Sequence, residues 1–128
     1  MKIRSYKDLS VWQKSMDLVE ECYRLTDGFP RNEEFGLKSQ IRRAPVSIPS
    51  NIAEGSVRHS SNEYCRYLAI ALGSVAELET QIELGRRLGF VQDDETQSLT
   101  NGCQEVGRML NGLRGSIAVH ITAYSTDL

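Results

Sequence analysis

Residues that could carry out catalysis or bind a metal are few in this sequence and lie far apart. The two histidines are His59 and His120, and the three cysteines are Cys22, Cys65 and Cys103, with no CxxC motif. A di-iron site in a helical bundle needs a pair of Glu-x-x-His motifs, and a zinc site needs closely spaced Cys and His ligands. Because neither spacing occurs and no glycine-rich phosphate loop is present, we expect no catalytic, metal-binding or cofactor-binding residues. The sequence therefore predicts a protein without enzyme activity or cofactors.

Arginines offer a second kind of chemistry, which is the binding of phosphate groups. A guanidinium group matches phosphate geometry, but a chain with a net charge of −2 and a pI near 5.7 needs a local basic patch to bind nucleic acid. We predict such a patch, for RNA, DNA or another partner, from residues in the middle of the chain: Arg42, Arg43, Arg58, His59 and Arg66. The same arginines could instead pair with the nearby carboxylates, which would leave little net potential: Glu54, Glu63 and Glu79.

The composition predicts a single globular domain over residues 1–128, with 40% hydrophobic and 25% charged residues. The start MKIRSYKDLSVWQK lacks the apolar segment of a signal peptide, and no run approaches the roughly 18 apolar residues of a membrane span. An odd number of widely spaced cysteines is typical of reduced core thiols. We therefore expect a cytoplasmic protein with no membrane partner.

The elements that must position these residues are helices, because apolar residues recur with a period close to 3.6 along the chain. The helices that we expect cover approximately residues 9–27, 33–55, 61–88 and 94–121. A short C-terminal tail follows. Short connections force consecutive helices to be antiparallel, so the sequence predicts an all-α fold, an up-down antiparallel four-helix bundle. Pro45 and Pro49 cannot donate backbone hydrogen bonds, and we expect the second helix to be kinked there.

The second helix has a polar face of unusual composition. Ser47, Asn51 and Glu54 lie on it, and Ser and Asn are mediocre helix formers that solvent alone would not favour. We predict that these residues form a hydrogen-bonding surface against another subunit or a ligand; the alternative is a polar side that faces water. Asn51 would bridge helices or subunits, and Glu54 would pair with Arg58 one turn later.

Glu79 lies within the apolar stripe of the expected third helix, where a carboxylate is costly unless it is paired. Arg42 is the expected partner, and Arg43 is the second choice. We interpret Glu79 as one half of a structural ion pair; the alternative is a general acid or base, or a metal ligand.

The first helix carries two apolar stripes side by side. One contains Trp12, and the other consists of Val11, Leu18, Cys22 and Leu25. Together the stripes span about half of the helix circumference, which exceeds the roughly 100° needed for one core. The second stripe is therefore a candidate subunit interface; the alternative is that this helix packs deeply between two neighbours of its own bundle.

Four stretches of the sequence, YKDLSVWQKSMDL, IRRAPVSIPSNIAEG, YLAIALGSVAELETQI and LGF, resemble the four-helix-bundle family named for proteins encoded in 23S rRNA intervening sequences. The resemblance runs from about Tyr6 to Ile117. It implies short bundles assembled into pentameric rings. It also implies a relationship to a branch of the family that serves as accessory proteins to retroelement reverse transcriptases. Those accessory proteins bind nucleic acid.

The residues and the resemblance together predict a non-enzymatic homo-oligomer, ring-forming and pentameric, that acts as a nucleic-acid-associated binding or accessory protein. Its expected partners are copies of itself, RNA or DNA, and a protein such as a reverse transcriptase. A ring would repeat any basic patch several times and so raise its avidity for a polyanion. The alternative is a protein–protein scaffold without nucleic-acid binding.

Overall fold

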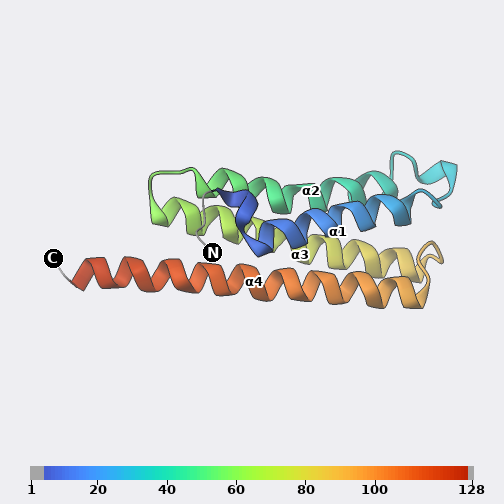
Figure 1. Cartoon of the computed structure of the whole chain (residues 1–128). Helices are drawn as coiled ribbons and strands as arrows, with labels where there is room; N and C mark the ends of the chain where they lie inside the picture. The colour runs from blue at the N-terminus through green and yellow to red at the C-terminus, as the bar shows by residue number, and fades with distance from the viewer. Residues whose placement is uncertain (1–4, 127–128) are drawn as a thin grey trace.

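The computed structural model describes residues 5–126, and every regular element in this range is helical. The four long helices are α1 (Ser10–Thr26), α2 (Leu37–Ser56), α3 (Ser61–Arg87) and α4 (Asp93–Thr126). Two short 3₁₀ helices precede α1 and α2, namely η1 (Tyr6–Asp8) and η2 (Arg31–Glu33). The predicted all-α fold with four helices is therefore confirmed. Figure 1 shows the α1–α2 and α3–α4 connections at one end of the molecule and the α2–α3 turn at the other.

The second helix begins at Leu37, four residues later than the expected start at residue 33. The backbone of Gly36 lies outside the helical region, with φ −104° and ψ −120°. Glu33 Oε2 then accepts a 2.9 Å hydrogen bond from the N–H of Leu37, which satisfies a free donor of the first turn. At the other end of the chain α4 continues to Thr126, beyond the expected end at 121, and residues 127–128 lie outside the described residues.

The ends of α3 are set by side-chain and backbone capping. Ser60 Oγ accepts a 3.2 Å hydrogen bond from the N–H of Glu63, as the Ser-x-x-Glu spacing predicts for a helix start. After the last turn Gly89 has a positive φ of 83°, and the N–H of Phe90 donates to the carbonyl of Gly85 at 2.8 Å. Glycine suits this position because it adopts left-handed backbone angles without strain.

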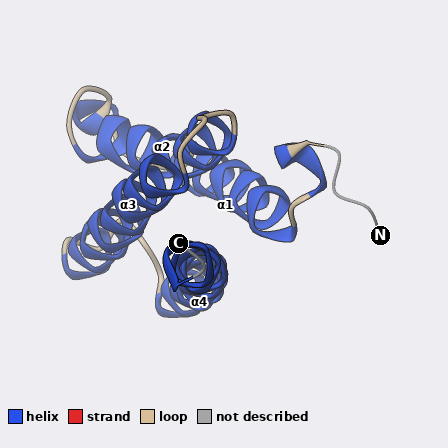
Figure 2. Ribbon diagram, turned by 90° about the vertical axis from the view of Figure 1, so that its left-hand side faces the viewer, coloured by secondary structure: helices blue, strands red, loops and turns tan. Residues whose placement is uncertain are grey.

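The core lies where the four helices meet, and each helix packs against two others. Helix α2 packs against α1 and α3, and α4 packs against α3 and α1 (Figure 2). Fully buried aliphatic side chains fill the space between them, and burying each contributes roughly 1.5–3 kcal/mol. They include Ile41, Ile48, Ile52, Leu68, Leu78, Ile82, Leu99 and Leu110.

The candidate subunit interface on α1 is wrong, because the core of the same chain buries it. Val11, Leu18 and Cys22 are buried, and Leu25 packs partly buried against the same core. The wide apolar arc of α1 is explained by its two neighbours, α2 and α4, which cover it from both sides. Met16, from the stripe that contains Trp12, is 39% exposed instead.

Both prolines of the second helix are buried, and the helix continues through them without a break. The kink at Pro45 and Pro49 stays a prediction. Within the described part of the chain, no helix combines the length and the apolar character that crossing a membrane would require.

Candidate functional site

The predicted basic patch is divided into two groups that lie far apart along α2. Arg42 and Arg43 are in its first half, whereas Arg58, His59 and Arg66 surround the turn between α2 and α3. With a rise of about 1.5 Å per residue, most of the length of α2, roughly 20 Å, separates the groups. The structure therefore does not bring these residues together into one patch.

Arg42 is a structural residue that connects α2 to the C-terminal end of α1. Its Nε donates to Thr26 Oγ1 at 2.7 Å, and its Nη2 donates to the carbonyl of Tyr23 at 3.1 Å and to Asp27 Oδ1 at 2.8 Å. The guanidinium carbon also lies 4.5 Å from the centroid of the Tyr23 ring. The predicted ion pair between Arg42 and Glu79 is therefore wrong.

Glu79 lies at the edge of the core, where α3 approaches α4. Its neighbour Leu78 takes the fully buried position of this turn, so the Glu79 carboxylate remains partly exposed. Its negative charge contributes to the raised pKa of the Cys103 thiol on α4, after the larger effect of burial. No ion pair to Glu79 is found among the described residues, and Arg43 is likewise without one.

The α2–α3 turn holds a compact cluster around the ring of Tyr67. Arg58 Nη2 donates to Glu54 Oε1 at 2.9 Å and to the Tyr67 hydroxyl at 2.8 Å. The guanidinium carbons of Arg58 and Arg66 lie 5.0 and 4.8 Å from the centroid of the Tyr67 ring. Arg66 also forms an ion pair of 3.2 Å with Glu63. The predicted pair between Glu54 and Arg58 is thus confirmed.

Both arginines of this cluster remain able to bind an anion. Their side chains are exposed, and a guanidinium has more N–H donors than the hydrogen bonds to Glu54, Glu63 and Tyr67 occupy. Glutamates neutralise part of their charge, as the alternative reading of the sequence expected for Glu54 and Glu63. The cluster therefore offers fixed donors beside an aromatic ring rather than a strong positive field.

The polar face of α2 is used mainly inside the chain. Ser74 Oγ on α3 donates to Ser47 Oγ at 2.8 Å, which bridges the two helices. Asn51 Nδ2 donates to the carbonyl and to the hydroxyl of Ser47, at 2.7 and 2.9 Å. Asn51 therefore bonds within α2, and Ser47 makes the bridge to α3 that was predicted for Asn51. A bridge from Asn51 to another subunit stays a prediction.

Tyr67 and Ser74 belong to these clusters, although neither was predicted as a site residue. A signal for Ser74 was present, since a serine at an apolar position of the third helix needs a hydrogen-bond partner. The partner of Tyr67 could not be derived from spacing, because it depends on how the two helices meet at the turn.

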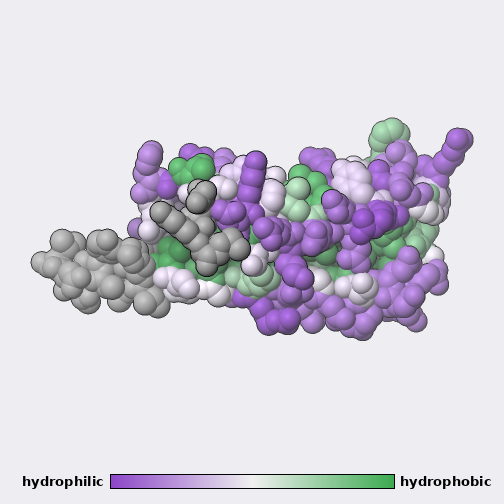
Figure 3. Space-filling view, in the orientation of Figure 1, coloured by the Kyte–Doolittle hydropathy of each residue, from purple (hydrophilic) through white to green (hydrophobic). Residues whose placement is uncertain are grey.

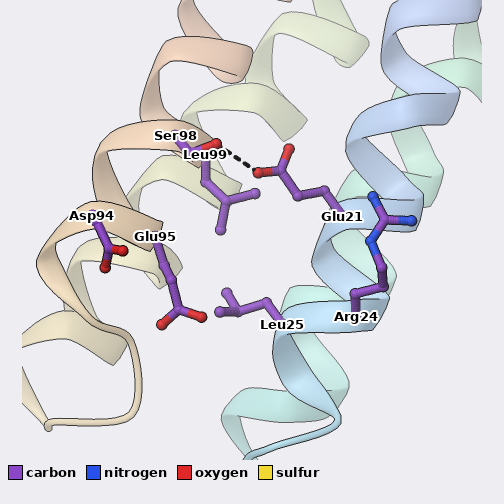
Figure 4. Close-up of a pocket in the computed structure, with 7 residues that line it drawn as sticks. All are labelled: Glu21, Arg24, Leu25, Asp94, Glu95, Ser98 and Leu99. Carbon is purple, nitrogen blue, oxygen red and sulfur yellow. Dashed lines mark hydrogen bonds between the residues drawn. The ribbon is translucent and has the colours of Figure 1, made fainter.

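A groove between α1 and the first turns of α4 has a volume of about 350 Å³ (Figure 4). Ser98 Oγ donates to Glu21 Oε1 at 2.9 Å across it, and Glu95 Oε1 accepts the N–H of Gln92 at 2.9 Å. Carboxylates outnumber the single arginine, so the groove disfavours phosphate groups. The residues that line it are Glu21, Arg24, Leu25, Asp94, Glu95, Ser98 and Leu99.

Charges of the described residues are distributed unevenly between the two ends of the bundle. Carboxylates dominate the end that contains the α3–α4 connection, where the side-chain hydrogen bond from Arg86 lowers the pKa of Glu83 to about 2. At the other end, Arg58 and Arg66 lie at the α2–α3 turn, and each is paired with a single glutamate, Glu54 or Glu63. Within residues 5–126 no three His, Cys, Asp or Glu side chains come together as metal ligands.

Comparison with known proteins gives a consistent result. The family model described as 23S rRNA-intervening sequence protein matches residues 7–112. A crystal structure of a protein with unknown function from the S23 ribosomal protein family of Bacteroides thetaiotaomicron is similar, with a TM-score of 0.76 and 27% sequence identity. That similarity covers 81% of this chain and 97% of the other. No curated protein matches the chain. The α2–α3 turn lies inside the region that the family model matches.

Proposed function

The chain belongs to the family of 23S rRNA-intervening sequence proteins, and from this premise we propose that it works without catalysis, as a ring-forming helical bundle that binds nucleic acid. The binding surface is the α2–α3 turn, with Arg58, His59 and Arg66. The resemblance in sequence favours five subunits in the ring. An accessory role beside a nucleic-acid enzyme, such as a reverse transcriptase, fits a protein of this kind.

The arrangement of Arg58 and Arg66 around Tyr67 supports this proposal most directly. Hydrogen bonds and ring contacts hold both guanidiniums in place, so that little side-chain entropy is lost when they bind. Exposed His59 follows Arg58 in the same turn and adds a further donor. The cluster can donate to phosphate oxygens, and it has no series of aromatic rings that would read bases. Binding is therefore expected to depend on the backbone of the nucleic acid rather than on its sequence.

Assembly into a ring explains how a turn with little net positive charge binds nucleic acid. Each subunit contributes only a few donors, but a ring presents the same turn several times on one particle. The paired Glu54 and Glu63 keep the affinity of one subunit low. Binding to a long polyanion then needs several turns at once, so it is expected to require the assembled state and a minimum length of nucleic acid.

A salt titration with fluorescently labelled RNA and DNA tests the proposal. Fluorescence anisotropy of the native protein should show binding that weakens by orders of magnitude between about 50 and 200 mM salt. Replacing Arg58 and Arg66 with Gln should weaken binding at least ten-fold and flatten the salt dependence. The matched control is Arg86→Gln with Arg87→Gln, which removes the same charge from arginines that also pair with glutamate. Equal losses in the two variants, or no binding by the native protein, would reject the proposed surface.

The alternative function is a scaffold that binds protein without nucleic acid. Exposed apolar side chains favour it: Phe35, in the connection before α2, is almost fully exposed. Green apolar patches also interrupt the hydrophilic surface along α2 in Figure 3. An assembled protein that shows no salt-dependent binding to RNA or DNA would support this alternative.

A further inference from the structure

An apolar groove runs along the outside of the bundle between α1 and α2. Its volume is about 300 Å³. Met16 on α1 and Val46 on α2 are 39% and 40% exposed at its surface, although both are large apolar side chains. Such a groove between two helices suits the ridge of a third helix. The residues that line it are Tyr6, Trp12, Met16, Val19, Val46, Pro49, Ser50 and Ala53.

The outward face of α3 is a ridge of the matching kind. Ile70 and Leu84 are 41% and 46% exposed, and they lie on the same side of the helix. The exposed side of this helix also carries small residues, which allow another helix to approach closely: Ala69, Gly73, Ala76 and Thr80. A Cβ added to Gly73 would meet no atom within 4 Å, so no described part of the chain covers this face.

We propose that the α1–α2 groove of one copy receives the outward face of α3 from the next copy. This inference rests on the proposed ring, because it names the two surfaces that join the subunits. The groove and the ridge are different surfaces, so each copy offers one of each. Contacts of this heterologous kind generate a closed ring when the rotation between neighbours closes.

Charge complementarity identifies a second copy as the occupant. Arg43 is exposed one turn before Val46, which lines the groove, and it has no ion pair among the described residues. Glu77 is exposed on the α3 face, where its Oε1 accepts a 3.2 Å hydrogen bond from Gln81 Nε2, and it has no ion pair among the described residues. The groove thus carries an unpaired cation and the ridge an unpaired anion. In the assembled state Arg43 pairs with Glu77 of the next copy, which fixes the register of the two helices.

Charge reversal with rescue tests this pairing. Light scattering should give the native protein a mass several times 14.4 kDa. Arg43→Glu and Glu77→Arg should each weaken assembly at least ten-fold and shift the mass toward 14.4 kDa. The double variant restores opposite charges and should restore the native mass. Arg108→Glu, on the exposed side of α4, is the control and should assemble normally.

A bulky residue on the ridge provides an independent measurement. Gly73→Leu should fold normally, because the position is open in the single chain, but it should block close approach of the groove. Gly112→Leu, at an equally open position of α4, should assemble like the native protein. Circular dichroism checks that both variants fold.

The outcomes separate this inference from the proposed ring. If the native protein has a mass of 14.4 kDa, the ring itself is rejected. An assembled native protein whose single charge reversals also stay assembled would reject the two surfaces and leave the ring in place. Dissociated single variants that the double variant does not rescue would reject the pairing of Arg43 with Glu77.

Discussion

Gly55 on α2 lies against Tyr67 on α3 so closely that a Cβ added to Gly55 would be 2.7 Å from Tyr67 Cβ. The same added atom would be 3.1 Å from Tyr64 Cδ1. The absence of a side chain at Gly55 therefore lets α2 and α3 meet at the turn. This contact also sets the position of the Tyr67 ring, beside which Arg58 and Arg66 are held.

We expect Gly55→Ala to destabilise the protein by about 1–3 kcal/mol, although alanine favours helices, because the backbone of α2 must move away from α3. Gly112→Ala is the matched control. Its added methyl group meets nothing within 4 Å, so it should stabilise the protein by roughly 0.5–1 kcal/mol. Urea unfolding followed by circular dichroism measures both changes. If Gly55→Ala also stabilised the protein, the close contact with Tyr67 would be refuted.

Arg42→Ala should cost about 1.5–3 kcal/mol of unfolding free energy, because Arg42 donates to Thr26, Tyr23 and Asp27 at the end of α1. Arg42→Lys keeps the charge but not the planar fork of donors, so its stability should lie between those of the native protein and Arg42→Ala. Arg24→Ala, at an exposed position of α1, should change the free energy by less than about 0.5 kcal/mol. Thermal and urea unfolding would show the order of the variants, and equal values for Arg42→Ala and Arg24→Ala would contradict it.

The helices and some local pairs could be predicted because the information lies within a few residues of sequence. A period of 3.6 identifies helices, and an acid four residues before a base identifies a pair such as Glu54 with Arg58. The start of α2 was predicted four residues too early, because Glu33 ends a 3₁₀ turn and caps α2 from there, and the sequence of such a turn resembles an ordinary helix start.

The orientation of α1 and the partner of Arg42 could not be predicted, because both depend on how helices that are distant in the sequence pack together. Both stripes of α1 are apolar, so only the positions of α2 and α4 determine which of Met16 and Leu18 is buried. Glu79 was the predicted partner of Arg42, but the partner depends on which helix end lies at the level of Arg42. In the structure that is the end of α1 with Asp27, and Glu79 lies toward α4 instead.

The three cysteines should differ in reactivity. Burial is the main cause that raises the pKa of Cys22 and of Cys103 from 9.0 to about 12, so both are neutral thiols at pH 8. Cys65 is only partly buried. A thiol reagent should therefore modify Cys65 first in the native protein and the other two at least ten-fold more slowly, with all three reacting quickly in urea. Cys65→Ser should remove the fast reaction, and fast reaction of this variant would contradict the buried positions.

The buried thiols of Cys22 and Cys103 also make the free energy of unfolding depend on pH in alkaline solution. Between pH 9 and about 12 the unfolded chain loses the protons of Cys22 and Cys103 while the folded chain keeps them. The unfolded state then binds fewer protons, so the free energy of unfolding should fall as pH rises through this window. Replacing both residues with Ala would remove this part of the pH dependence. Urea unfolding at pH 8 and pH 10 measures this fall in unfolding free energy for the native protein and for the double variant. An equal fall in both proteins would contradict the prediction.

Leu18 and Met16 lie two residues apart on α1 and should respond in opposite ways to an introduced charge. Leu18 is only 2% exposed, so Leu18→Asp places a carboxylate in the core and should cost more than about 3 kcal/mol, enough to unfold much of the protein. Met16 is at the surface of the α1–α2 groove, so Met16→Asp should cost less than about 1 kcal/mol while it dissociates the assembly. Urea unfolding and light scattering on both variants separate the two effects. A folded, dissociated Leu18→Asp beside an assembled Met16→Asp would reverse the assignment, because it would place Leu18 between subunits and Met16 outside the interface.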